Sequence, residues 1–109
     1  MLAKHCLQEF KLDCQLRRLT ERTIKGYYNN TLNFLNYAEK HHEVVEVEEI
    51  RTVHIKHYVQ YLLNKKLAAT YINGILKCLR AYFNFAIQEE YAFSNPTAKV
   101  SMQREPKVL

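Results

Sequence analysis

The sequence predicts an all-helical domain, on the strength of two observations. Its 109 residues include only 2 Gly and 2 Pro, and both prolines fall in the last fifteen residues, so residues 1–95 lack the strongest helix breaker. Apolar side chains, which make up 48% of the chain, recur at helical spacing in four successive segments. A chain of this length suits one domain with a single core.

The first and second helices are expected over residues 4–18 and 21–41. Thr20 is a favourable N-cap for the second helix, and Glu21 places a carboxylate in its first turn, where the helix dipole favours it. In the first helix the apolar spacing is carried by Leu7, Phe10 and Cys14. The second helix has one broad apolar side, and its other side, which is hydrogen-bonding and not salt-bridged, is shared by Arg22, Lys25, Gly26, Asn29, Asn33 and Asn36.

An acidic, solvated segment is expected over residues 42–51, either a connecting loop or a brief extended piece, because valines and glutamates alternate there without a helical period. A third helix should follow, with Thr52 as its cap and an end near Lys66. Its apolar residues fit the i, i+3, i+4, i+7, i+8 pattern without a miss: Ile55, Tyr58, Val59, Leu62 and Leu63.

The fourth helix has the strongest pattern and is expected from about Ala69 to Tyr91. Its apolar side chains fall within about 120° of arc: Ile72, Ile75, Leu76, Leu79, Phe83, Ala86 and Ile87. Opposite them lies a polar stripe without an acidic residue: Thr70, Asn73, Lys77, Arg80 and Asn84. Ordinary solvated helix faces mix Glu with Lys, so the missing acids are unusual. Asn95-Pro96 then ends helical structure, and Thr97–Leu109 is expected to be an extended linker or tail.

Charge is distributed unevenly along the chain. The net charge is +5, and residues 50–88 carry six basic side chains and no acidic one, whereas residues 39–49 carry five acids and one base. This balance makes an acidic partner plausible. The three cysteines cannot all pair, no secretory signal opens the chain, and no apolar run approaches the ~20 residues of a membrane span. We therefore expect a reducing cytoplasm and no membrane.

Catalytic and metal-binding patterns are weak. The cysteines lie on predicted helices and the two serines near the tail, so no nucleophile, base and acid are gathered in one cleft. His54 and His57 could share a metal, but no CxxC or HExxH motif supports them, and solvated surface histidines are favoured. The tyrosines could be base-stacking platforms, although core positions with the hydroxyl at the rim are favoured. We expect no catalytic residue, metal or cofactor.

The two polar faces suit a DNA duplex. A major groove about 12 Å wide accepts a helix that presents Arg, Lys, Asn and Thr to phosphates and base edges. A bland basic surface and a helical protein-interaction module with a basic docking face remain alternatives. A helix-turn-helix repressor is disfavoured, because no pair of short helices joined by a turn of 3 to 4 residues is present.

The sequence also resembles a known family. The similarity lies in residues 19–27, in Thr70-Tyr71-Ile72-Asn73, and in residues 79–86 leading to Ser94-Asn95-Pro96. These segments are similar to the core-binding domain of tyrosine recombinases, whose members include phage and transposon integrases. The resemblance covers about residues 3–100 and keeps the order of the elements. It implies a four-helix bundle of SAM-like fold that forms half of a C-shaped clamp around the recombination site.

The resemblance implies that the second and fourth helices contact double-stranded DNA of a recombination core site. Carried over residue by residue, it predicts contacts from Arg22, Thr23, Lys25, Asn29, Thr70, Asn73, Lys77, Arg80 and Asn84. The analysis of helix faces selects nearly the same set, except that Thr23 lies at the edge of its polar sector. The tyrosine nucleophile of the family belongs to a following catalytic domain, so none of the eight tyrosines is assigned that role and this chain alone is expected to be non-enzymatic.

The domain organisation implied is a core-binding domain over residues 1–100 and a linker over residues 101–109 toward a catalytic domain absent from this chain. Such a domain would hold the core-site duplex for DNA integration and recombination. Its expected partners are the duplex, that catalytic domain, and other recombinase protomers on DNA. For contacts between protomers the first helix offers spare apolar surface, expected at Leu2, Cys6, Phe10 and Leu16.

Overall fold

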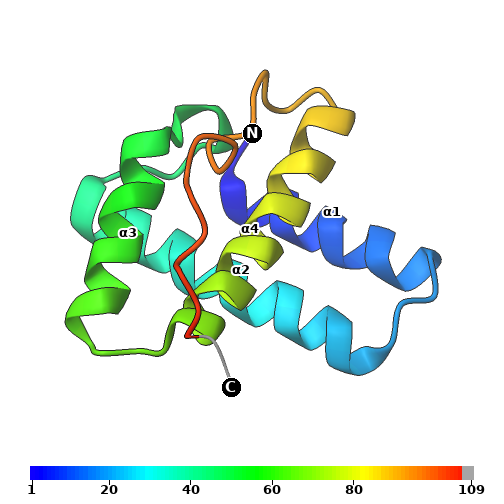
Figure 1. The fold of residues 1–109 in the computed structure, drawn as a ribbon. Coiled ribbons are helices and arrows are strands. Elements are labelled where there is room, and N and C mark those ends of the chain that lie inside the picture. Colours follow the sequence, from blue (N-terminus) through cyan, green and yellow to red (C-terminus); the bar gives the residue numbers. More distant parts are fainter. Residues whose placement is uncertain (107–109) are drawn as a thin grey trace.

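The computed structural model describes residues 1–106. Among these residues it contains four α-helices and a short 3₁₀ helix: α1 (Ala3–Leu16), α2 (Glu21–His42), η1 (Val47–Glu49), α3 (Thr52–Asn64) and α4 (Ala69–Gln88). Helix α4 packs against α1 and α2, and α3 packs against α2 (Figure 1). The described part of the chain has no strand, only an isolated β-bridge between Leu2 and Glu46. The predicted all-helical, four-helix fold is confirmed.

The core has two aromatic centres, and α4 contributes to both. At the first, the ring of Phe10 from α1 lies 5.6 Å from Tyr27 of α2 and 5.4 Å from Phe85 of α4, measured between centroids. At the second, Phe34 of α2 lies 5.1 Å from Tyr58 of α3 and 6.4 Å from Phe83 of α4. Because α4 serves both centres, nearly all of its predicted apolar arc is buried.

The three cysteines are buried and unpaired, as expected for small hydrophobic residues. Burial raises the pKa of the Cys6 thiol to about 11 and also raises the pKa of Cys14 and Cys78. The prediction of spare apolar surface on α1 is wrong for two residues, since Cys6 and Phe10 are 0% and 2% exposed, because they face α2 and α4. Leu2 and Leu16 are exposed.

The start of α2 agrees with the sequence, and the start of α3 differs by one residue. Thr20 caps α2, because its Oγ1 accepts a hydrogen bond of 3.2 Å from the Thr23 N–H. For α3 the N-cap is Arg51 and not the predicted Thr52. The reason is His54, whose Nδ1 accepts a hydrogen bond of 2.9 Å from the Arg51 N–H and so fixes the first turn.

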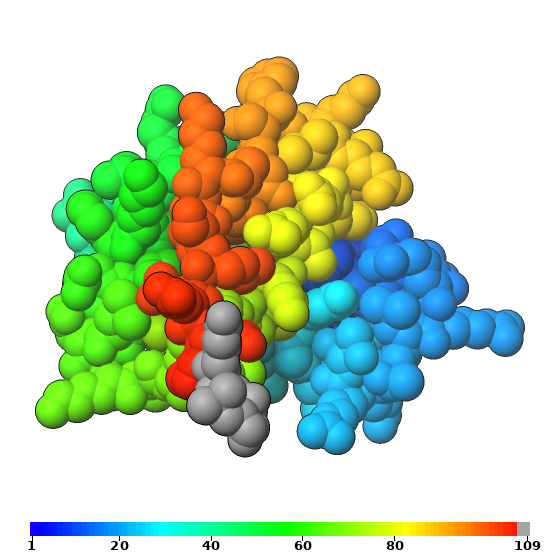
Figure 2. Space-filling view, viewed as in Figure 1, coloured from blue at the N-terminus to red at the C-terminus, as the bar shows by residue number. Residues whose placement is uncertain are grey.

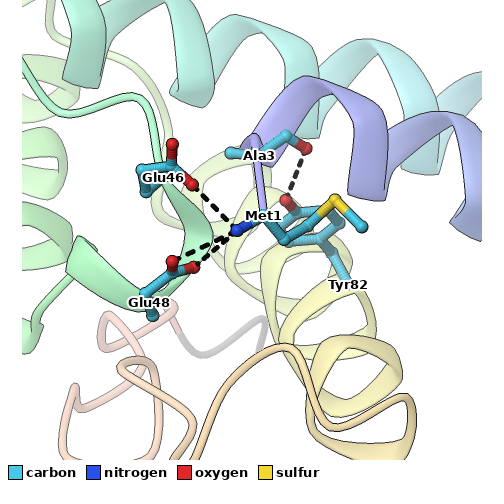
Figure 3. A network of polar contacts seen from close by, with 5 residues as sticks. All are labelled: Met1, Ala3, Glu46, Glu48 and Tyr82. Carbon is cyan, nitrogen blue, oxygen red and sulfur yellow. Dashed lines mark hydrogen bonds and ion pairs between the residues drawn. The ribbon is translucent and has the colours of Figure 1, made fainter.

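The prediction of a fully solvated loop between α2 and α3 is wrong in part. Val47 and Ile50 are buried in the core. The amino group of Met1 lies 2.8 Å from a carboxylate oxygen of Glu46 and 3.1 Å from one of Glu48 (Figure 3). In the same network the Tyr82 hydroxyl donates a hydrogen bond of 2.7 Å to the Ala3 carbonyl, so α4 holds the beginning of α1 beside this loop.

Each α-helix ends with a side-chain-bearing residue in the left-handed region. These residues, with φ between 56° and 63°, are Arg18, Glu43, Lys66 and Glu90. The apolar residue after each one donates its N–H back into the last turn, as Tyr91 does to the Ala86 carbonyl at 2.8 Å. Helix α4 therefore stops at Gln88, three residues before the predicted end.

The segment after α4 folds back over the molecule. In the described residues it contains turns without a helix, and it runs across the face formed by α3 and α4 (Figures 1 and 2). Thr97 is 1% exposed, and Val100 and Met102 pack against the core. Residues 107–109 of the predicted linker lie outside the described residues.

Candidate nucleic-acid interface

Helices α2 and α4 pack against each other at residues next to their polar faces. At this contact the Asn30 side-chain amide of α2 lies 3.5 Å from the Cys78 sulfur of α4, within hydrogen-bonding distance. The neighbouring residues in sequence, Asn29 and Lys77, are both exposed. The sequence does not single out Asn30, because a helical period does not show which residue of one helix touches the next.

Seven of the nine predicted contact residues have exposed side chains: Arg22, Lys25, Asn29, Thr70, Lys77, Arg80 and Asn84. Thr23 is half-buried, and its hydroxyl accepts a hydrogen bond of 3.0 Å from Thr20 at the N-cap of α2. On α4, Lys77 and Asn84 are separated by two helical turns, about 10 Å along the axis, which is comparable to the width of a major groove.

Asn73 differs from the rest of the stripe because the C-terminal segment covers it. It is 5% exposed. Its amide donates to the Gln103 carbonyl at 2.9 Å, and its side-chain oxygen accepts the Gln103 N–H at 2.7 Å. The amide also donates to Glu105 at 3.1 Å. The stripe on α4 itself has no acid, but the fold brings a carboxylate to this end of it, which helical periodicity on α4 could not reveal.

A second contact with the C-terminal segment lies farther along α4. The Asn95 side-chain amide donates to the Arg80 carbonyl at 3.2 Å and to the Asn84 side-chain oxygen at 2.9 Å. The Asn95 oxygen in turn accepts the N–H and the hydroxyl of Thr97. Asn95, which precedes Pro96, thus ties the segment after α4 back to the helix. The side chain of Arg80 stays exposed.

The cations of the two faces have no acidic partner in the described residues. The ion pairs found there join the amino terminus to Glu46 and Glu48, Lys4 to Glu39, and Arg17 to Asp13. Arg22, Lys25, Lys77 and Arg80 therefore keep their charge available to an external anion within residues 1–106.

A groove of about 260 Å³ lies beside Asn84, between α1, α2 and α4. It is lined by Arg17, the C-cap of α1, together with Gln88 of α4 and Tyr27 of α2. Sequence reasoning missed Arg17 and Gln88, because their proximity to Asn84 depends on how α1 packs against α4.

Residues 1–106 show neither a metal-binding cluster nor a membrane-spanning helix. They contain no group of three His, Cys, Asp or Glu side chains arranged to hold a metal ion. None of the helices described there is both long and apolar enough to cross a membrane.

The fold and these faces define the class of protein: a small helical domain with an exposed basic surface on α2 and α4, of which α4 itself contains no acidic residue. The family of the phage integrase N-terminal SAM-like domain matches residues 6–92, and the chain belongs to this family. The family is the N-terminal domain of tyrosine recombinases, so the resemblance seen in the sequence is confirmed.

Curated relatives carry the same assignment. The chain is 30% identical over 88 residues to the tyrosine recombinase XerD of Rickettsia conorii, covering 81% of this chain and 28% of the relative. It is 24% identical over 93 residues to the tyrosine recombinase XerC of Staphylococcus epidermidis, covering 85% of this chain and 31% of that relative. The chain thus spans about three tenths of the length of these proteins. No solved structure matches it.

Proposed function

We propose that this domain binds double-stranded DNA through the polar faces of α2 and α4 and holds a recombination core site. The observation that supports this most is the set of exposed cations on two crossing helices, Arg22, Lys25, Lys77 and Arg80, none of which has an acidic partner within residues 1–106. Lysine and arginine that are free of internal ion pairs can neutralise phosphates and release counterions, which is the main source of affinity for a duplex.

Within this proposal the residues divide by chemistry. Arg22, Lys25, Lys77 and Arg80 contact phosphates and fix the orientation of the duplex, while the polar Asn29, Thr70 and Asn84, with Thr23 at the edge, make limited base contacts. Asn73 acts indirectly, by holding the C-terminal segment. Alone, such a surface should bind non-specific duplex with a dissociation constant on the order of 10⁻⁴ to 10⁻⁶ M at physiological salt.

The domain has a positioning role and no catalytic residue in this proposal. The relatives of this chain are named tyrosine recombinases. We assign their recombination chemistry to a catalytic domain outside this chain. That domain and other protomers bound to the same DNA are the proposed protein partners, and the cytoplasm is the proposed compartment.

Fluorescence anisotropy of a labelled duplex at several salt concentrations tests the proposal. Lys77→Ala and Arg80→Ala should each weaken binding and reduce the salt slope by about one, because each removes about one phosphate contact. Lys56→Ala is the matched control, since Lys56 is an exposed cation on α3, outside both faces. Unchanged affinity and slope in both α4 variants would contradict the proposed face. A protein-docking module would be favoured instead if an acidic protein displaced the duplex and if the affinity for the duplex did not depend on salt.

A further inference from the structure

A second cleft lies on another part of the molecule, between α2, α3 and the start of α4. Its volume is about 420 Å³, within the range of small-molecule sites. Four tyrosines and two lysines line it: Tyr37, Tyr58, Tyr61, Tyr71, Lys40 and Lys65. None of these residues belongs to the set assigned to duplex binding.

Three of the tyrosine rings, those of Tyr37, Tyr58 and Tyr61, form a continuous aromatic surface in this cleft, and Tyr71 lines the cleft beside them. Tyr61 lies 5.0 Å from Tyr37 and 6.0 Å from Tyr58, between centroids, and the planes of Tyr58 and Tyr61 differ by only 13°. Tyr58 is buried and anchors the group, whereas Tyr37 and Tyr61 are half-buried and Tyr71 is 54% exposed. The favoured interpretation of the tyrosines as core therefore holds for Tyr58, while its neighbours leave ring surface accessible to a flat ligand.

Positive charge and amide groups accompany the rings. The Lys65 ammonium lies 4.4 Å from the centroid of Tyr61. Lys40 lines the same cleft from α2, together with the exposed amides of Asn33 and Asn36. No acidic residue of the described chain lines the cleft. A ligand that matches all three features has an aromatic face, an anionic group and a hydrogen-bonding edge.

We propose that this cleft binds a nucleotide. The base stacks on the Tyr61 and Tyr71 rings, the phosphate is neutralised by Lys40 and Lys65, and the Asn33 and Asn36 amides bond the base edge. Stacking on tyrosine is available to every base, so the site recognises the nucleotide as a chemical unit and not a particular sequence. The nucleotide is either free or an unpaired unit of a nucleic-acid strand. Asn33 and Asn36 also belong to the polar face of α2, but no residue of this site is among those assigned contacts with the duplex, so the site does not depend on those contacts.

Titration of the 109-residue chain followed by NMR tests the site with three probes: deoxyadenosine monophosphate, deoxyadenosine and inorganic phosphate. The monophosphate should shift the resonances of cleft residues at lower concentration than either part of it alone. Tyr71→Ala should weaken its binding about fivefold or more, because a stacking surface is lost. Lys65→Gln should weaken binding of the monophosphate and leave that of the nucleoside unchanged.

Matched controls separate the cleft from the general surface. Phe93→Ala removes an aromatic side chain outside the cleft that is 98% exposed, and Lys56→Gln removes an exposed cation of α3, the helix that Lys65 caps at its C-terminal end. Both variants should bind the monophosphate as the unmodified chain does. No shift of cleft resonances at 10 mM monophosphate, or equal binding by inorganic phosphate with no effect of Tyr71→Ala, would overturn the proposal.

Two duplexes distinguish a free nucleotide from a nucleotide of a DNA strand: one is fully paired, and the other contains one unpaired deoxyadenosine. Tighter binding of a duplex with one unpaired deoxyadenosine, abolished by Tyr71→Ala, would assign the site to a DNA strand. Equal binding of the two duplexes with retained monophosphate binding would assign it to a free nucleotide. Lys77→Ala should weaken both duplexes and leave the monophosphate unaffected, so failure of the duplex-binding face is distinguishable from failure of this site. Loss of monophosphate binding in Lys77→Ala would overturn the assignment to the cleft.

Discussion

Thr31 is a polar residue at a fully buried position of α2. Its side chain is 0% exposed, and within residues 1–106 its Oγ1 has no hydrogen-bond partner. A buried hydroxyl without a partner costs about 1–3 kcal/mol of desolvation. Thr31→Val keeps the shape of the side chain and removes the hydroxyl, so we expect the free energy of unfolding to rise by about 1 kcal/mol in urea denaturation.

Thr31→Ser is the matched control, since it keeps the hydroxyl and deletes the buried methyl group. It should lower the free energy of unfolding by about 1 kcal/mol, the typical effect of deleting one methyl group from a packed core. A destabilised Thr31→Val variant would show that the hydroxyl is satisfied in solution and would refute this explanation.

The sequence predicts the exposure of a side chain correctly where that exposure depends on the period of a single helix. The period of α4 alone places Lys77, Arg80 and Asn84 opposite the apolar arc, and they are exposed. Asn73 follows the same period but is buried, because the C-terminal segment covers it. Gln103, thirty residues later in that segment, makes hydrogen bonds with the Asn73 amide. Such pairings depend on the path of a segment that has no periodicity, so the sequence could not reveal them.

The four helix ends are an unusual feature at the level of elements. All four use a left-handed residue with a Cβ, whereas glycine is the usual choice there. A left-handed conformation costs a residue with a Cβ about 1–2 kcal/mol. Glu90→Gly relieves this cost at the end of α4 and should stabilise the protein by about 1 kcal/mol more than Glu90→Ala, after the greater chain entropy of glycine is subtracted.

The Glu90→Ala variant is the control because it also removes the carboxylate from the negative end of the helix dipole while it keeps the Cβ. The comparison is made by thermal or urea unfolding of the two variants. Equal stability of the two would contradict the argument that backbone strain at this position matters.

The same feature explains which element boundaries the sequence predicts. The start of α2 has a favourable cap in Thr20, and its prediction is confirmed. The apolar pattern continues to Tyr91 and no glycine marks the end of α4, so the sequence predicts an end three residues beyond the observed one at Gln88. At α3 a histidine performs the role that Glu or Gln usually has in a capping box, so the conventional signal pointed to Thr52.

At the scale of the whole molecule the sequence predicts the core well and the surfaces between helices poorly. Periodicity identifies the apolar sides of all four helices, since burial follows the helical repeat. The tyrosine cleft and the groove beside Asn84 arise where three helices meet. Their positions depend on packing angles, and a one-dimensional pattern does not contain them.

Three histidines join α2 to α3 and should make the stability of the protein depend on pH. The His42 ring lies 5.0 Å from His54 and 5.2 Å from His57, between centroids. Burial lowers the pKa of His42, and the nearby His57 and His41 lower it further. Burial also lowers the pKa of His54, with further contributions from His42, His57 and Arg51. Each lowered pKa means that the unfolded chain binds more protons than the folded one.

The free energy of unfolding should therefore be highest above the ordinary histidine pKa of about 6.5 and should fall as the pH is lowered through that value. Protonation has a second consequence at His54, because its Nδ1 then becomes a donor and can no longer accept the Arg51 N–H that begins α3. Urea unfolding between pH 7.5 and pH 5 measures this dependence. His42→Gln should flatten it, whereas His5→Gln, an exposed position on α1, should leave it unchanged. A pH dependence that is the same in His42→Gln as in the unmodified chain would show that the histidines between α2 and α3 are not its origin.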